Sequence, residues 1–223
     1  TVDLACFKQS PHFLTNTFFI YQRGFSCCLS NQVQAGCLGG IMKGFNRKNQ
    51  FLSLCGLNCG LCPMFLNKNC PGCGGGEGNQ SCRIARCSME HNGVEYCCQC
   101  REYPCEKYEH IDDFDSFITH RNRRTDLEKV RQFGAEAYNT EQMEKMKILD
   151  ILLSGYNDGR KKTLFCVAVN LLNLQELKEA LREIESRPDM ETLTLKEKSA
   201  FAAGVLSEIA SRRKVDLKLH RKR

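Results

Sequence analysis

The sequence lacks an uninterrupted apolar run of the about 18 residues that a membrane-spanning helix requires. Its first 41 residues also lack a basic start, a clear apolar core and a small-residue cleavage site, so we expect neither a signal peptide nor an anchor. The sequence shows no serine–histidine–aspartate set, phosphate-cradling loop or paired carboxylates placed for acid–base chemistry. It therefore assigns no catalytic residue and favours a non-enzyme without membrane partners.

Cysteine is scarce after residue 105, where Cys166 stands alone, although the whole chain has 16 cysteines. The thiol chemistry is therefore confined to the first half, and the second half must fold by burying apolar surface. Cys166 lies inside an apolar run and is expected to be a core residue. Ten cysteines form a spaced array that we predict to bind metal: Cys55, Cys59, Cys62, Cys70, Cys73, Cys82, Cys87, Cys97, Cys100 and Cys105.

The spacing within this array favours metal over disulfides. The unit Cys-x-x-Cys recurs at Cys59/Cys62, Cys70/Cys73 and Cys97/Cys100. Two intervening residues place both sulfurs on one side of a tight turn, as chelation of a single ion requires. Small secreted disulfide domains instead pair distant cysteines and carry a secretory signal. The sequence thus favours a cytoplasmic metal-binding protein.

Zinc is the favoured metal, and four thiolates at about 2.3 Å would make a closed, structural site. The strongest local signal is Cys70-Pro71-Gly72-Cys73-Gly74, which has the form of a zinc knuckle. Ten ligands suggest two zinc ions with two thiols left over, and the sequence leaves their partition open. His91 and His110 could assist, although we expect both to be surface histidines.

An iron–sulfur cluster is the alternative to zinc. Cys55, Cys59 and Cys62 match the three-cysteine spacing of radical S-adenosylmethionine enzymes. Those enzymes need a long α/β barrel after the motif, whereas about 160 residues follow here, and many of these belong to the cysteine array. Other iron–sulfur ligation, serving redox or cluster-dependent chemistry, stays open.

The stretches "CGLNCGLCP", "CPGCGGG" and "CRIARCSMEHNGVEYCCQCREYPCEKY" resemble a family of bacteria and archaea catalogued as domain of unknown function 3795. The match covers about residues 52 to 108 and includes all ten cysteines together with Ile84, Gly93, Tyr103, Pro104 and Glu106. The resemblance implies that the ten cysteines are the metal ligands and that Cys98 is additional. It implies no particular reaction.

Most of the positive charge lies at the C-terminus. The chain carries a formal charge of +6, and residues 212–223 hold seven lysines or arginines against one aspartate. A basic tail is weaker evidence for nucleic-acid binding than a basic face, and we expect this tail to be a solvated terminus. The sequence therefore predicts a protein or a nucleic acid as partner without choosing between them, and leaves the oligomeric state open.

The fold class expected is α-rich, with a small, irregular, metal-stapled Cys-rich module followed by a small helical domain. We divide the chain into residues 51–110, the Cys-rich module, residues 111–215, the helical domain, and residues 216–223, a basic tail. Residues 1–50 are expected to be disordered or to lie before the true start. Met42 is the expected first residue, because the glycine codons before it leave room for a ribosome-binding sequence.

Helical signals dominate the second half. We expect a short helix within residues 106–125 and a helix from a Thr140 cap to Gly155. Asn173-x-x-Glu176 and Thr194-x-x-Glu197 have the form of capping boxes that precede apolar stripes. Pro188 should separate these two helices.

The run "TLFCVAVNLL", residues 163–172, is expected to be helical, with three cations at its N-terminus, where the helix dipole disfavours positive charge. A bound anion would compensate. The alternative is a solvated basic turn. The candidate anion site consists of Asn157, Gly159, Arg160, Lys161 and Lys162.

Overall fold

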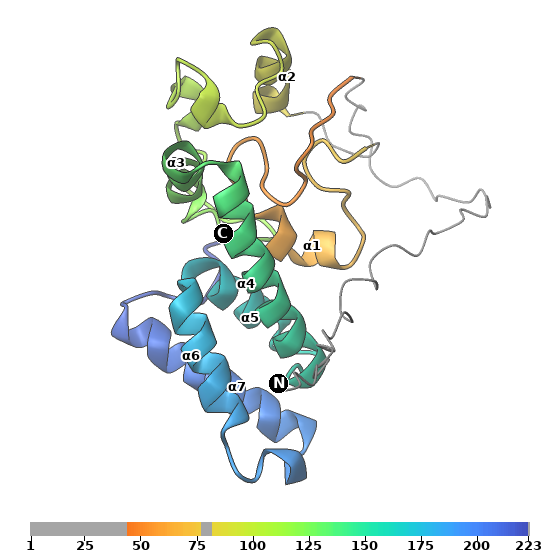
Figure 1. Cartoon of the computed structure of the whole chain (residues 1–223), viewed down its shortest axis with the longest axis vertical. Coiled ribbons are helices and arrows are strands. Elements are labelled where there is room, and N and C mark those ends of the chain that lie inside the picture. Colours follow the sequence, from red (N-terminus) through yellow and green to blue (C-terminus); the bar gives the residue numbers. More distant parts are fainter. Residues whose placement is uncertain (1–43, 77–81, 223) are drawn as a thin grey trace, which may run out of the picture. The chain divides into compact units, whose positions relative to one another are not determined.

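The computed structural model describes residues 44–76 and 82–222, which belong to one compact unit of the chain. These residues form seven α-helices, four 3-10 helices and no β-strand, which confirms the predicted α-rich fold class (Figure 1). The α-helices are α1 (Pro63–Leu66), α2 (Arg83–Glu90), α3 (Arg123–Phe133), α4 (Ala135–Gly155), α5 (Lys162–Leu171), α6 (Leu174–Glu185) and α7 (Leu195–Arg212). The 3-10 helices are η1 (Cys59–Leu61), η2 (Cys97–Gln99), η3 (Glu106–Tyr108) and η4 (Met190–Thr192).

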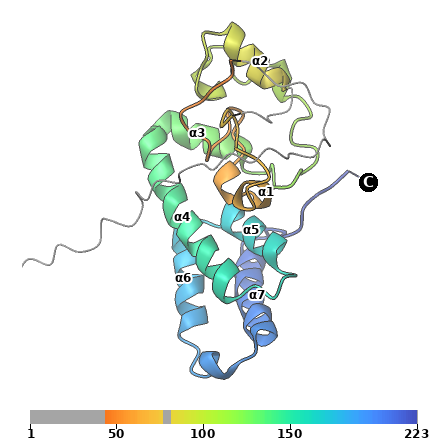
Figure 2. The ribbon, with the colours of Figure 1, turned by 90° about the vertical axis from the view of Figure 1, so that its right-hand side faces the viewer.

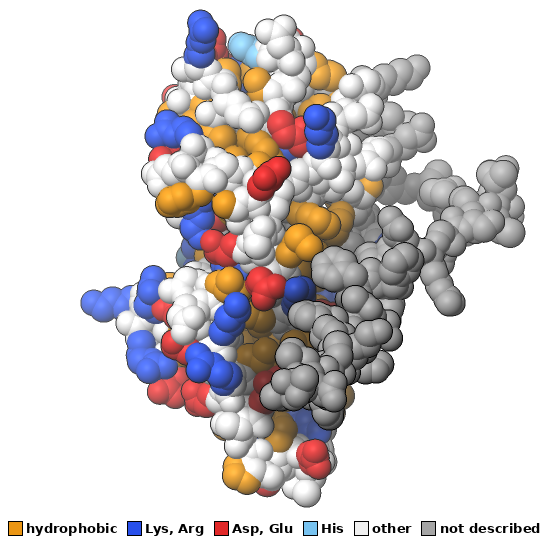
Figure 3. All heavy atoms as spheres, viewed as in Figure 1, with side chains coloured by type: hydrophobic (Ala, Val, Ile, Leu, Met, Phe, Trp, Pro, Cys, Tyr) orange, Lys and Arg blue, Asp and Glu red, His pale blue; other side chains and the backbone are white. Residues whose placement is uncertain are grey.

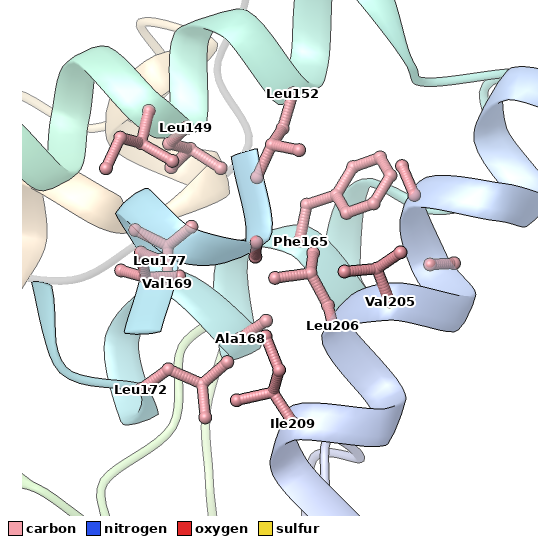
Figure 4. Close-up of a cluster of buried hydrophobic side chains, with 14 of the residues drawn as sticks. Leu149, Leu152, Phe165, Ala168, Val169, Leu172, Leu177, Val205, Leu206 and Ile209 are labelled. Carbon is pink, nitrogen blue, oxygen red and sulfur yellow. The ribbon is translucent and has the colours of Figure 1, made fainter. Parts of the chain in front are cut away.

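Helices α4 to α7 pack around the main hydrophobic core. Side chains from all four helices point toward one another in this core (Figure 4), because each helix repeats apolar residues along one face. Cys166 is buried in the same cluster, as expected. Representative members are Leu149, Leu152, Phe165, Val169, Leu177, Val205, Leu206 and Ile209.

Both predicted capping boxes are confirmed. The Asn173 side chain accepts from the Glu176 N–H at 2.9 Å, and Glu176 returns a bond to the Asn173 N–H at 3.0 Å. Thr194 and Glu197 make the same reciprocal pair at the start of α7. Pro188 lies between α6 and α7, as predicted, and residues 163–171 of the run predicted to be helical lie in α5, which ends before Leu172.

Two expectations about helix position are wrong. Helix α4 begins at Ala135 rather than at a Thr140 cap, because Gly134, at a φ of 84°, already separates it from α3. Thr140 lies inside α4 and donates its hydroxyl to the Glu136 carbonyl at 3.0 Å. Of the range 106–125, in which a short helix was expected, only η3 and the start of α3 are helical, and residues 109–122 between them form turns that we call the connector. The Asp115 carboxylate accepts from local donors in the connector, which offers this backbone an alternative to a helix.

Residues 215–220 contact the connector and the end of α7 (Figure 2), so this part of the tail is held in place, while its basic side chains are exposed as expected of a solvated terminus. The Arg121 guanidinium donates to the Asp216 carbonyl at 2.6 Å and to the Lys218 carbonyl at 2.9 Å. Val215 and Leu217 pack against the main core. Backbone bonds and apolar contacts therefore hold the tail, while its lysine and arginine side chains are exposed.

The Cys-rich part contributes two smaller clusters. One contains Phe45, Leu54, Ile84 and Ala85. The other spans the predicted boundary at residue 110, because Leu52, Tyr96 and Tyr108 pack there with residues of α3 and α4. Leu61 of η1 reaches the main core instead. The divisions at residues 51, 111 and 216 stay predictions.

The expectations for residues 1–43, including the start at Met42, lie outside the described residues. Residues 44–50 are described, and Phe45 and Arg47 among them are buried. This short segment therefore packs with the Cys-rich part. Across the described ranges, no helix has both the length and the apolar character needed to cross a membrane.

Candidate metal centre

Two of the three Cys-x-x-Cys units follow the same backbone path. The Cys62 N–H donates to the Cys59 carbonyl at 3.0 Å, and the Cys100 N–H donates to the Cys97 carbonyl at the same distance. Each unit thus closes a 3-10 turn whose second cysteine is extended, with ψ near 131° and 140° respectively. This repeated turn is the conformation expected of a chelating pair.

Four thiols line one pocket, and we call them the Cys87 cluster. The pocket encloses about 20 Å³, room for one water molecule or an ion of similar size. Helix α2 supplies one thiol, η2 and its cap supply two, and the residue before η3 supplies the fourth. The members are Cys87, Cys97, Cys100 and Cys105.

Burial raises the pKa of two thiols of the Cys87 cluster. Burial raises the pKa of Cys97 to about 12, and the Tyr108 hydroxyl beside it partly opposes this. Burial also raises the pKa of Cys87, against the positive charge of Lys107. A thiolate ligand must be deprotonated, so metal binding here would release protons.

A second group, the Cys59 cluster, consists of Cys55, Cys59 and Cys73. Burial, then the charges of Cys73 and Cys55, raise the pKa of Cys59. Burial raises the pKa of Cys73 as well, and nearby Arg47 lowers it. The Leu54 N–H points at the Cys73 sulfur, 3.5 Å away. Donors directed at a sulfur favour its anionic form.

Arg47 is a residue that sequence reasoning missed, because it falls in the segment predicted to be disordered. Its guanidinium is 2% exposed and donates to the carbonyls of Leu52 and Glu95 at 2.8 Å and 2.7 Å. Gly74 permits this approach, since a Cβ there would lie 2.7 Å from the Arg47 side chain. The sequence signal that could have indicated a residue packed closely here, as Arg47 is, is the glycine after the Cys70-x-x-Cys73 unit.

The first cysteine loop is anchored to the helices by polar contacts. Asn58 precedes Cys59 and donates to the Gln142 side chain at 2.5 Å and to the Tyr138 hydroxyl at 3.3 Å. Tyr138 in turn lies beside Asp126, whose pKa burial raises to about 7. Every member of this chain is buried. The position of Cys59 therefore depends on α3 and α4.

The ten predicted ligands are not gathered into one array. In residues 44–76 and 82–222, no three histidine, cysteine, aspartate or glutamate side chains converge closely enough to hold a metal ion. Besides the two clusters, Cys62 lies near Cys70, whose charge contributes to the raised pKa of Cys62 after burial. Cys82 is exposed at the start of α2.

The two histidines considered as ligands differ in position. His91 lines the pocket of the Cys87 cluster, and its Nδ1 lies 3.5 Å from the Cys87 sulfur. His110 is exposed and pairs with Asp113 at 3.0 Å, as expected of a surface histidine. The position of His91 was not predicted, although its spacing of four from Cys87 on a helix could have indicated it.

The candidate anion site forms a compact turn at the start of α5. The Gly159 N–H donates to the Asn157 side chain at 3.1 Å, and the Arg160 N–H donates to the Asp158 carboxylate at 3.0 Å. Lys162 contacts Asn67 through its ammonium group. These donors have partners within the chain, and Arg160 is exposed, so the solvated turn accounts for the geometry. Lys161 is half-buried beside them.

Comparisons of this chain with protein-family models, curated proteins and solved structures found no match. The resemblance to the family catalogued as domain of unknown function 3795 therefore stays a prediction.

Proposed function

We propose that the protein binds structural zinc through its cysteines and that the zinc-stapled part serves as an interaction module. The observation that carries this proposal is the Cys87 cluster, in which four thiols from three chain segments line one pocket, although in the described residues they do not converge to metal-ligand distances. Four thiolates complete a tetrahedral zinc site and leave no position for water or substrate. Such a centre stabilises a fold and does not catalyse a reaction.

Two zinc ions per chain follow from the two separate clusters. The Cys59 cluster would hold the second ion, with Cys62 or Cys70 as the fourth ligand, since both belong to the same loop and lie near each other. This partition leaves Cys82 and one of these two cysteines over. Apart from Cys82, the cysteines of the described ranges are free thiols, so the other nine predicted ligands are available to a metal.

The Cys-rich part has too small an apolar core to fold stably without such metal centres. Its own apolar cluster contains four buried side chains, and one of these is an alanine. A core of this size supplies little free energy of folding, whereas a structural zinc site supplies it directly. Zinc binding would therefore fix the loops that carry the exposed surface of this part.

A protein is the better supported partner. Basic and acidic side chains are interspersed on the face shown in Figure 3, rather than gathered into a basic stripe. The basic tail is held on the connector by its backbone, which removes much of the reach of a free arm. We therefore propose that the protein is cytoplasmic and that its partner is another protein rather than a nucleic acid.

Zinc removal tests the proposal directly. We expect a chelator to abolish the tertiary structure of the Cys-rich part, monitored by hydrogen exchange at the amides of η2 and α2, while the core of α4 to α7 keeps its protection. Reloading with zinc should restore the protection. An unchanged exchange pattern after complete metal removal would contradict a structural role, and a brown, iron-containing protein would favour the cluster alternative.

A further inference from the structure

We propose that the connector and the C-terminal segment together form a docking surface for an acidic segment of a partner protein. The surface consists of Phe114 and Phe117 in the connector and of Lys218, Arg221 and Lys222 in the C-terminal segment. The inference rests on the proposed choice of a protein as partner and adds the chemistry of that partner. It does not involve the zinc centres.

Two phenylalanines of the connector are exposed. Phe114 is 46% exposed and Phe117 is 58% exposed, and the buried Asp115 lies between them in the chain. The Asp115 carboxylate accepts from the His120 N–H at 2.7 Å and from the Thr119 hydroxyl at 3.3 Å. These bonds fix the turn that carries both rings. Exposed aromatic side chains that lie this close in a fixed turn are typical of interaction sites.

Contacts with the C-terminal segment bring three exposed cations to the same turn. The Asp115 N–H donates to the His220 carbonyl at 2.7 Å, one residue after Phe114 in the chain. The Arg121 guanidinium donates to the Lys218 carbonyl at 2.9 Å. The cations are therefore held near the rings by contacts of their own backbone, which leaves their side chains at the surface. These cations are Lys218, Arg221 and Lys222.

The positive charge of this surface has no counter-charge of its own. Two acids that are close to it in the chain already have partners, since Asp216 lies 3.2 Å from the His220 ring and Asp113 lies 3.0 Å from the His110 ring. In the part of the chain that the structure describes, none of the three cations has an ion-pair partner. Carboxylates of a partner would supply the missing charge and steer that partner to the site.

Affinity requires the phenylalanines as well as the cations. Ion pairs between exposed side chains contribute little to binding, because water and salt screen them. Aromatic anchors at the centre of an interface instead carry most of its binding free energy. We therefore expect the partner segment to place acidic residues around at least one apolar side chain that covers the two rings.

The charges around the rings fit a protein better than a nucleic acid. Bases also stack on aromatic rings. However, Asp113 and Asp216 are 50% and 51% exposed, and they would repel a continuous phosphate backbone. The guanidinium of Arg121 is already used by the carbonyls of Asp216 and Lys218, so it offers no free fork to a phosphate. A protein segment can place its carboxylates away from the two aspartates.

The test measures how the full chain binds a fluorescent peptide that combines several glutamates with one phenylalanine, by fluorescence anisotropy. We expect binding that weakens as the salt concentration rises. The double variant Phe114→Ser/Phe117→Ser should weaken it by about 10-fold or more. Phe133→Ser, which alters a phenylalanine of α3 that is 69% exposed, is the matched control and should leave the affinity unchanged.

The contribution of charge is tested separately. Lys218→Gln/Lys222→Gln should weaken binding and reduce its dependence on salt, whereas Lys196→Gln, at an exposed position of α7, should change neither. A peptide with glutamine in place of each glutamate should also bind more weakly than the acidic peptide. Equal binding of the acidic and neutral peptides would overturn the proposal.

Three further outcomes would also overturn it. They are an unchanged affinity in the double phenylalanine variant, no binding of the acidic peptide by the wild-type chain at millimolar concentration, and tighter binding of oligoadenylate than of the acidic peptide. The last result would assign the surface to a nucleic acid. Each of these outcomes leaves the zinc proposal standing, because metal content tests that proposal independently.

Discussion

Asp115 and His220 hold each other through two hydrogen bonds although 105 residues separate them. The Asp115 N–H donates to the His220 carbonyl at 2.7 Å, and the His220 N–H donates to the Asp115 carboxylate at 2.9 Å. This pair closes the C-terminal end of the chain onto the connector.

Replacement of Asp115 by alanine should destabilise the protein. The Asp115 carboxylate is buried and also accepts from His120 and Thr119, so its loss leaves several donors without an acceptor. We expect a loss of about 1 to 3 kcal/mol in the free energy of unfolding, measured by urea denaturation. Asp113→Ala, in the same connector but exposed, is the control and should cost much less. Equal effects would show that the tail contact adds nothing.

Cys98 in η2 and Cys100 at its C-terminal cap offer a matched test of the ligand assignment. Cys100→Ser removes a member of the Cys87 cluster and should lower the zinc content by one ion per chain. Cys98→Ser removes a half-buried thiol outside the pocket and should leave the zinc content unchanged. Metal analysis of both purified variants decides the point, and zinc loss in Cys98→Ser alone would refute this partition.

Replacement of Gly56 by alanine should lower the stability of the protein, whereas replacement of Gly204 by alanine should raise it. Gly56 has a φ of 95°, and a Cβ there would lie 2.5 Å from the Arg123 carbonyl oxygen. The strain and the clash together should cost about 2 to 5 kcal/mol of stability. Gly204 lies in α7 with open space around it, so Gly204→Ala should add up to about 1 kcal/mol. Thermal unfolding of the two variants would show whether the first cysteine loop packs this closely on α3.

Titration of the Asp126 carboxyl should lower the free energy of unfolding as the pH rises. Its carboxyl has a pKa of about 7 in the folded protein against an ordinary value of 3.8, so the folded state binds more protons between these values. This contribution to stability is present below about pH 4 and is lost as the pH rises through 7.

The variant Asp126→Asn lacks this titration. Its stability relative to wild type should therefore improve by about 1 to 4 kcal/mol between pH 4 and pH 7, measured by urea denaturation. Loss of metal at low pH affects both proteins and cancels in the comparison. A pH-independent difference would show that Asp126 is ionised throughout this range.

The helical half was largely predictable because its signals are local. A capping box such as Asn173/Glu176 is formed by residues three apart, and apolar stripes of one helix face can be counted directly. The start of α4 was misplaced because Gly134, which lies before the apolar pattern begins, decides it. The connector was misjudged because Asp115 competes with a helix for its own backbone.

The candidate site was predictable in composition but not in arrangement. The spacing of Cys59 and Cys62 or of Cys97 and Cys100 specifies a turn, and both turns are present. The division of the cysteines into two clusters depends on how distant loops pack, for which no local signal exists. Arg47 was missed for the same reason, since its partners Cys73 and Glu95 are 26 and 48 residues away.

The content of zinc, iron and inorganic sulfide in protein purified anaerobically without chelators tests the central claim most directly. Two closed thiolate centres predict about two zinc ions per chain and no inorganic sulfide. Iron together with sulfide would contradict the zinc assignment and would move the chemistry to the loop of Cys55, Cys59 and Cys62. A protein that retains no metal would contradict the account of the cysteines altogether.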